Sequence, residues 1–170
     1  MTGGRVVIME ITRIEAAHLV GLVQQFIELL EGTDRSGAPV DDPAIARLVP
    51  SAYSDDAEAA SEFRALTQSD LLSRRDSDAR VLLTSLGSDD LMAEEIELDD
   101  PRFTEVMTVT LSPDEVRSWM RTLAAVRLVL ATRLGIDTED THDDEDARFG
   151  IYDWLGYRLD GLVQAASATY

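Results

Sequence analysis

Two segments of the chain share one pattern, a short apolar run followed by a long helical repeat. "RVVIMEI" leads into "TRIE" and an apolar helical pattern, and "RFTEVMTVTL" leads into "SPDE" and a second one. Short apolar runs of this kind predict strands, and apolar residues spaced at three and four predict amphipathic helices. We therefore predict strands near 5–11 and 103–111 and helices over 13–31 and 113–134, the second helix ending at Gly135.

The two predicted helices begin with the same local signal. Thr12 with Glu15, and Ser112 with Glu115, fit the S/T-x-x-E capping box, and Pro113 occupies the first helical position of the second helix. Each strand therefore runs directly into a helix, and the two short strands are expected to pair because neither is stable alone. The sequence leaves open whether this is an internal repeat or two unrelated strand-to-helix turns.

The rest of the chain adds further helices and polar connections. Asp42 and Pro43 start a short helix to about Val49, "SDDAEAASEFRAL" forms another, and "TQSD" is expected to cap a third, "LLSRRDSDARVLLTSL", which ends at Gly87. A last helix runs from about Phe149 to Ala166. The predicted fold is mostly α, with about five helices and a small two-stranded sheet.

A chain of 170 residues fits one domain, so we predict a single domain over 1–170. Two acidic stretches, near 88–101 and 137–147, are predicted to be solvated linkers. No apolar run reaches the length of a membrane span, and the first residues lack a signal-peptide pattern. We expect a cytoplasmic protein without membrane attachment.

The stretch "DTEDTHDDED", residues 137–146, carries seven acidic residues and one histidine. It does not fit an EF-hand, because His142 occupies the position that requires glycine. Zinc needs a second nitrogen or sulfur ligand at suitable spacing, and the other histidine, His18, falls on the polar face of the first helix. We expect no metal site, with weak divalent-cation binding as the alternative.

Composition removes several classes of chemistry. The chain has no cysteine and no lysine, so disulfides, thiolate nucleophiles, Schiff-base lysines and P-loop lysines are all excluded. The formal charge of -18 argues against direct binding to nucleic acid and favours basic protein partners. We find no recognisable catalytic motif and expect neither an enzyme nor a bound cofactor.

Three arginines, Arg75, Arg127 and Arg158, fall on helix faces that are otherwise apolar. Their stems could cover apolar surface while the charged heads reach water or acidic side chains. Alternatively, two or more converge on a pocket for an anion or for a partner's carboxylate. That second interpretation would make the protein a small-anion binder or an unrecognised enzyme. For Arg127, the candidate acceptors are Glu15, Glu58, Glu62 and Asp153.

Three segments together resemble a known family: "DPAIARLVPSAYSDDAEAASEFRALTQSDL", "LSPDEVRSWMRTLAAVRLVLATRLGI" and "YDWLGYRLDGLV". They are similar to the actinobacterial oxidative-stress regulators, a family formerly described as a domain of unknown function. The resemblance implies a small, mostly helical, cytoplasmic regulator that contacts a transcription sigma factor under redox stress. Because this chain has no cysteine, a thiol switch does not carry over.

These observations favour a regulatory protein that acts through a protein partner. The first helix is also apolar over about half its circumference, which is generous for a domain of this size and predicts a homodimer. The residues that make up this broad apolar face are Leu19, Leu22, Val23, Phe26, Ile27 and Leu30.

Overall fold

The computed structural model describes residues 4–36, 41–49, 55–93, 99–136 and 145–168. Within them the chain forms six α-helices, two short 3-10 helices and one two-stranded sheet, which confirms the predicted mostly helical fold. The elements in order are β1 (Val7–Thr12), α1 (Arg13–Ser36), α2 (Pro43–Leu48), α3 (Ala57–Leu86), α4 (Ser88–Ala93), η1 (Pro101–Thr104), β2 (Val106–Leu111), α5 (Pro113–Leu134), η2 (Ala147–Phe149) and α6 (Gly150–Ser167).

The two strands pair as predicted, in an antiparallel sheet that places Val7 opposite Leu111 and Thr12 opposite Val106. The second strand starts later than expected, because Asp100 caps the 3-10 helix η1, which occupies residues 101–104. Alternate residues, among them Ile11 and Leu111, are buried against the helices, while the other face of the sheet is exposed.

Both predicted capping boxes are present. The amide of Thr12 donates to Glu15 Oε2 at 2.9 Å and the amide of Glu15 donates to Thr12 Oγ1 at 3.3 Å. The matching distances for Ser112 and Glu115 are 2.7 and 3.3 Å. Helix α5 ends at Gly135, whose φ of 76° lies in the left-handed region that favours glycine.

The prediction of two separate helices between residues 54 and 86 is wrong, because α3 runs without a break from Ala57 to Leu86. The "TQSD" segment does not cap a new helix. Thr67 Oγ1 donates instead to the carbonyl of Phe63, one turn earlier, and Asp70 pairs with Arg74 one turn later. Residues that favour caps are also accommodated inside a helix when their side chains bond back to the preceding turn.

The prediction of a solvated linker at 88–101 is wrong for its first part. Gly87 ends α3 with a φ of 72°, and the chain immediately turns into α4, which packs against α1. Leu91 contributes to the core from this helix. Residues 94–98 lie outside the described residues, as do residues 137–144 of the second predicted linker.

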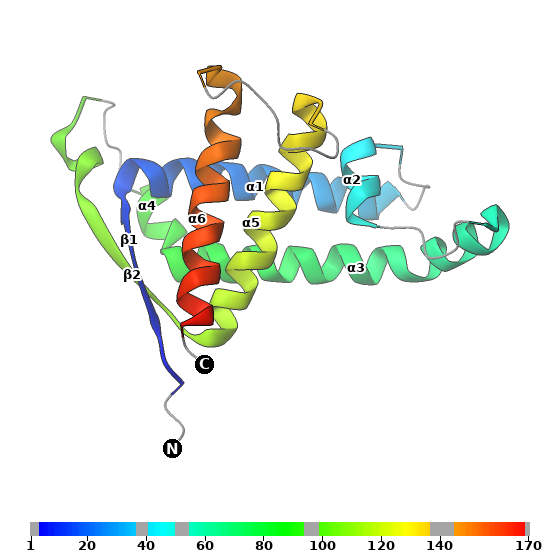
Figure 1. Cartoon of the computed structure of the whole chain (residues 1–170), viewed down its shortest axis with the longest axis horizontal. Coiled ribbons are helices and arrows are strands. Elements are labelled where there is room, and N and C mark those ends of the chain that lie inside the picture. The colour runs from blue at the N-terminus through cyan, green and yellow to red at the C-terminus, as the bar shows by residue number, and fades with distance from the viewer. Residues whose placement is uncertain (1–3, 37–40, 50–54, 94–98, 137–144, 169–170) are drawn as a thin grey trace.

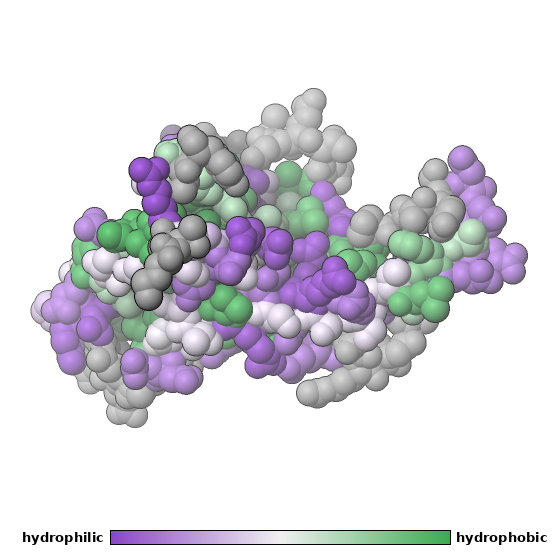
Figure 2. All heavy atoms as spheres, turned by 90° about the horizontal axis from the view of Figure 1, so that it is seen from below, coloured by the Kyte–Doolittle hydropathy of each residue, from purple (hydrophilic) through white to green (hydrophobic). Residues whose placement is uncertain are grey.

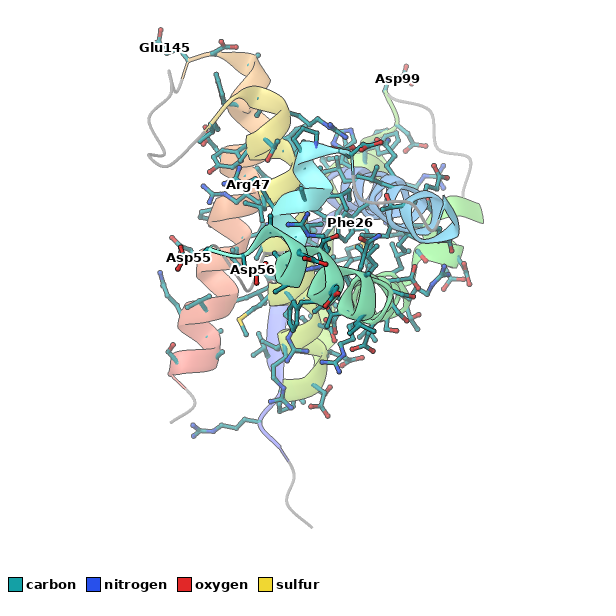
Figure 3. All side chains as sticks on the ribbon, turned by 90° about the vertical axis from the view of Figure 1, so that its right-hand side faces the viewer. Phe26, Arg47, Asp55, Asp56, Asp99 and Glu145 are labelled. Atoms are coloured by element: carbon teal, nitrogen blue, oxygen red, sulfur yellow. The ribbon has the colours of Figure 1, made fainter. Side chains whose placement is uncertain are left out.

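Helices α1 and α3 form one layer, and α5 and α6 cross over it as a second (Figure 1). The core lies between them, around the fully buried Trp119, whose Nε1 donates to Ser85 Oγ at 2.7 Å. Phe26 reaches into the same core (Figure 3). Helix α1 uses its broad apolar face within the chain, where Leu19, Val23, Phe26, Ile27 and Leu30 are all buried. Leu22, the sixth residue of that face, is partly buried. Most of the surface that suggested a homodimer is therefore already occupied, and dimerisation stays a prediction without that support.

Helix α2 is fixed on the C-terminal half of α5 by polar contacts. Asp42 caps α2 through the amide of Ala44 and pairs with both Arg133 nitrogens, at 3.0 and 2.6 Å. Arg47 reaches from α2 toward α5 (Figure 3) and donates to Thr132 Oγ1 at 2.9 Å. Together these contacts hold the short helix against α5.

The first turns of α3 project beyond the helical layers (Figure 1), and Asp55 and Asp56, labelled in Figure 3, directly precede them, with Asp56 as the N-cap. Hydrophobic residues lie on this projection (Figure 2), among them Phe63 and the strongly exposed Leu66. No helix in the described ranges is both long and apolar enough to cross a bilayer.

Candidate functional site

Helix α6 meets β1 and the start of α1 at a polar junction formed by Glu15, Trp154 and Arg158. Trp154 and Arg158 are one helical turn apart, so both side chains lie on the α6 face that covers α1. Trp154 Nε1 donates to Glu15 Oε1 at 2.9 Å, and Arg158 Nη2 lies 3.1 and 3.0 Å from the two carboxylate oxygens. The residue that caps α1 therefore also anchors α6.

The environment of Glu15 favours its charged form. Burial by itself raises the pKa of this carboxyl, but hydrogen bonds from the Thr12 amide, Trp154, Arg158 and the Thr12 hydroxyl outweigh it and hold the pKa at about 2. Glu15 is thus ionised at neutral pH, and its charge is balanced by the guanidinium of Arg158. The junction as a whole is neutral.

Arg158 also connects α6 to the sheet. Its Nη1 donates to the backbone carbonyl of Glu10 in β1 at 2.8 Å, and its side chain is only 19% exposed. Both terminal nitrogens of this guanidinium are engaged by Glu10 and Glu15, and its Nε, which has no hydrogen-bond partner among the described residues, is buried. The prediction that Arg158 binds an anion or a partner's carboxylate gains no support from this geometry.

A groove lies on each side of this junction. The β1–α6 groove has a volume of about 410 Å³, and the α1–α6 groove has a volume of about 490 Å³. The first is lined from β1 by residues 7–10 and from α6 by residues that include Tyr157, Asp160, Gly161 and Gln164. The second is lined by α1 residues that include His18, Gly21 and Leu22 and by Ile151 and Trp154 of α6.

The walls of the β1–α6 groove combine exposed apolar groups with acidic ones. Ile8 is 67% exposed and Tyr157 is 71% exposed, which is high for residues of this size. Glu10 and Asp160 are exposed on the two sides of the groove. Because Glu15 neutralises Arg158, the groove carries net negative charge. It is suited to a ligand that is both apolar and basic.

Arg127 lies half-buried between α5 and α6. Its guanidinium stacks on the ring of Tyr152, 3.9 Å from the centroid, and Nε lies 3.4 Å from the Tyr152 carbonyl. A side chain at Gly156 would come within 3.0 Å of Nε, so glycine permits this close approach. Arg127 therefore reaches inward as predicted, and an aromatic ring and a carbonyl surround it.

Three of the four predicted acceptors of Arg127 have other positions. Glu15 binds Arg158, as described above, and Glu58 and Glu62 are exposed near the start of α3. Asp153 is partly buried in the first turn of α6. The cation–π contact with Tyr152 is one of the interactions that accommodate the charge of Arg127, and its pairing with Asp153 stays a prediction.

Arg75 occupies a third environment, beside Asp78 and Phe26 where α3 packs against α1 and α5. Burial lowers the pKa of its guanidinium, and the nearby charge of Asp78 opposes that effect. The described contacts of Arg75, Arg127 and Arg158 involve different partners and no common pocket. Recognition of an anion by converging arginines stays a prediction, and the observed contacts favour the structural interpretation of each.

His18 lies exposed on α1, on the polar face as predicted, and lines the α1–α6 groove. The described ranges contain no group of three or more histidine or acidic side chains arranged to hold a metal ion. His142 and most of the acidic stretch that surrounds it lie outside those ranges, so the metal-free prediction for that stretch is untested.

Sequence reasoning found Glu15 as a helix cap and as a candidate acceptor for Arg127, and it placed Arg158 on the apolar face of the last helix. Their junction with Trp154 was missed because it joins residues more than 130 positions apart. The i,i+4 spacing of Trp154 and Arg158 was the available signal. It could not reveal which distant carboxylate the pair would meet.

Comparison with known proteins places the chain in a family. Residues 1–166 match the family described as "Domain of unknown function (DUF2017)". The chain belongs to the DUF2017 family. Neither a search of curated proteins nor a search of solved structures found a match. Membership in DUF2017 names no activity, and the resemblance to oxidative-stress regulators stays a prediction.

Proposed function

We propose that this DUF2017 protein is a cytoplasmic regulatory protein that acts by binding a basic protein partner through the surface formed by β1, α6 and the start of α1. The observation that carries the proposal is the β1–α6 groove, where exposed Ile8 and Tyr157 adjoin the acidic Glu10 and Asp160. Aromatic anchors surrounded by polar groups are typical of protein interfaces. The net charge of -18 favours association with a basic partner and disfavours association with nucleic acid.

The chemistry of the junction supports binding over catalysis. Glu15 is a carboxyl with a strongly shifted pKa, but the shift is downward, to about 2. A general acid or base works best with a pKa near the working pH, so Glu15 is poorly suited to either role. Its oxygens already accept hydrogen bonds from Thr12, Trp154 and Arg158. The contacts of Glu15 are those of a structural anchor.

The first partner to test is a transcription sigma factor, which the resemblance to the oxidative-stress regulators suggests. Without cysteine the chain has no thiol switch, so regulation would come from the amount of complex formed. Purified sigma factors from the same genome can be titrated into the protein in a calorimeter at two salt concentrations. We expect stoichiometric binding that weakens with salt, because acidic groups line the groove.

Matched variants locate the binding surface. Tyr157→Ala removes an exposed ring from the β1–α6 groove, and we expect the affinity to fall at least tenfold. Leu66→Ala removes a still more exposed side chain from the projecting end of α3, and we expect no change. Equal effects of the two variants, or tight binding that neither affects, would contradict the proposed surface. Failure of every sigma factor would remove that partner class.

A further inference from the structure

The outer edge of β1 presents backbone groups that the sheet does not use. The amide of Arg13 donates to the carbonyl of Glu105 at 3.0 Å, and these residues continue the β1–β2 register. In an antiparallel pair, hydrogen-bonded and non-hydrogen-bonded positions alternate. Val7, Met9 and Ile11 therefore bond to β2, while the amides and carbonyls of Ile8, Glu10 and Thr12 point away from it.

Contacts at the end of this edge confirm the assignment. The outward amide of Thr12 donates to Glu15, and the outward carbonyl of Glu10 accepts from Arg158. Among the described residues, the amide and carbonyl of Ile8 and the amide of Glu10 have no hydrogen-bond partner. Strand edges that are left open in this way pair readily with another extended chain.

The open edge faces a space large enough for another strand. The β1–α6 groove runs along residues 7–10 of β1 and is bounded on its far side by α6. Its volume of about 410 Å³ is comparable to that of a few side chains with their backbone. At Gly161, which lines the α6 wall, an added Cβ would meet nothing within 4 Å, so the groove is open at this point.

We propose that the outer edge of β1 binds an extended segment of the partner protein as a third strand, with basic side chains alternating with apolar ones. Strand addition of this kind draws affinity from main-chain hydrogen bonds and specificity from alternate side chains. Ile8 and Glu10 lie on the same exposed face of β1, so the basic side chains of the segment would meet Glu10 on that face. The alternate apolar side chains would lie on the opposite face, toward Val7 and Met9, which also line the groove. This inference rests on the proposed function, because it assigns a binding mode to the same surface.

The charges favour a partner segment over a second copy of this chain. Two copies paired at β1 would bring together two surfaces that each carry Glu10 and Asp160, on molecules with a net charge of -18. Repulsion between like charges opposes that arrangement. A segment with arginine or lysine at alternate positions has the opposite charge where the groove is acidic.

Binding can be tested with a defined peptide pool, acetylated and amidated heptapeptides with arginine at positions 2, 4 and 6 and valine, leucine, phenylalanine or tyrosine elsewhere. Amide resonances of the labelled protein report where the pool binds. We expect shifts concentrated at Val6, Ile8 and Glu10. A pool with glutamate in place of arginine should bind at least tenfold more weakly. Two further peptides carry N-methyl groups on alternate amides, one at the odd positions and one at the even positions. Only one of the two should lose binding, because only one set of amides donates to β1.

Two facing prolines test the edge itself. Ile8→Pro removes an outward amide from β1, and Thr110→Pro removes the outward amide of its cross-strand neighbour on the opposite edge of the same sheet. Neither change touches a β1–β2 hydrogen bond. We expect Ile8→Pro to reduce peptide binding at least tenfold and Thr110→Pro to leave it unchanged. Equal effects would overturn the assignment to β1.

A second pair of variants covers the case in which Ile8→Pro does not fold. Gly161→Leu fills the β1–α6 groove, and Gly21→Leu fills the α1–α6 groove; in both places the added Cβ has open space. Only Gly161→Leu should block the peptide. Absence of any resonance shift at millimolar peptide would overturn the inference, and so would a dimer in sedimentation that Ile8→Pro dissociates.

The outcomes separate this inference from the proposed function. A protein partner that is lost with Tyr157→Ala but retained with Ile8→Pro and Gly161→Leu would support the surface and refute strand addition. Peptide binding sensitive to Ile8→Pro, combined with failure to bind any basic protein, would support strand addition and refute the regulatory role.

Discussion

Replacement of Glu15 by glutamine tests whether one carboxylate holds α6 to the rest of the fold. Glutamine is accepted at this position of a capping box, so the start of α1 should survive. The substitution removes the negative charge that faces Arg158, at 3.0 Å, while keeping the size of the side chain. The guanidinium, only 19% exposed, is then left without its ionic partner.

The expected cost follows from the pKa of Glu15. A fall from 4.5 to about 2 corresponds to about 3 kcal/mol of stability at neutral pH, at about 1.4 kcal/mol for each pH unit. Because the Glu15 side chain is 29% exposed, solvent screening reduces this value. We therefore expect Glu15→Gln to lower the free energy of unfolding by about 2 kcal/mol at pH 7.

The pH dependence has a definite sign. A carboxyl whose pKa is lowered by folding contributes stability that is fully present above its unfolded value of 4.5. The contribution is lost as the pH falls toward about 2, because the folded form then takes up the proton too. The difference between wild type and Glu15→Gln should thus be constant from pH 7 to about 5 and shrink below it.

Urea unfolding followed by circular dichroism at a series of pH values measures this difference. Glu115→Gln is the matched control, because Glu115 closes the equivalent capping box of α5. No arginine pairs with Glu115 among the described residues. We expect a loss of at most about 0.5 kcal/mol for the control. Equal losses for the two variants, or a Glu15→Gln difference that does not change between pH 5 and pH 2.5, would refute the reasoning.

Three further predictions concern stability and are measured by thermal or urea unfolding. Gly161→Ala should raise the free energy of unfolding by about 0.5 to 1 kcal/mol, because alanine favours the helix and has open space at this position. Gly156→Ala should show no such gain, because its Cβ would push Arg127 off the ring of Tyr152. A larger gain at Gly156 than at Gly161 would contradict this contact. Arg127→Met should cost less than about 1.5 kcal/mol, since the stem volume remains and a half-buried charge disappears; a loss above 3 kcal/mol would show that the charge itself is essential. Asp42→Ala removes both the cap of α2 and the ion pair with Arg133, so it should lower the free energy of unfolding by about 1 to 2 kcal/mol. Asp42→Asn removes only the ion pair and should cost less. Equal costs would show that the cap adds nothing to stability.

Local signals in the sequence predicted much of the fold. The capping boxes at Thr12 and Ser112 fixed the starts of α1 and α5, and Gly135 fixed the end of α5, because each depends on residues within one turn. The same local reasoning failed at Thr67, where the side chain bonds inside the helix. A cap and an interior position use the same residue types, and packing against neighbouring elements decides between them.

The candidate site depended on distant contacts and was less accessible from the sequence. The inward direction of Arg127 followed from its helical wheel, but its partner, the ring of Tyr152, belongs to another helix. The open edge of β1 requires the strand register, which the sequence does not contain. The apolar face of α1 suggested an interface between copies of the chain. The sequence pattern shows which residues are apolar, but it does not show that α3 and α5 cover them.

The pairing of β1 with β2 also sets an order of events during synthesis. The two strands are separated by about 100 residues, and ribosomes add about 5 to 20 residues per second. The first strand therefore waits on the order of 5 to 20 s for its neighbour, with both edges open. During this interval the helices from α1 to α4 are made, so β2 reaches β1 after the helices of the first layer and before α5 and α6. Helix α6 is made later still, so closure of the sheet and then the docking of α6 come after the first helices have been made.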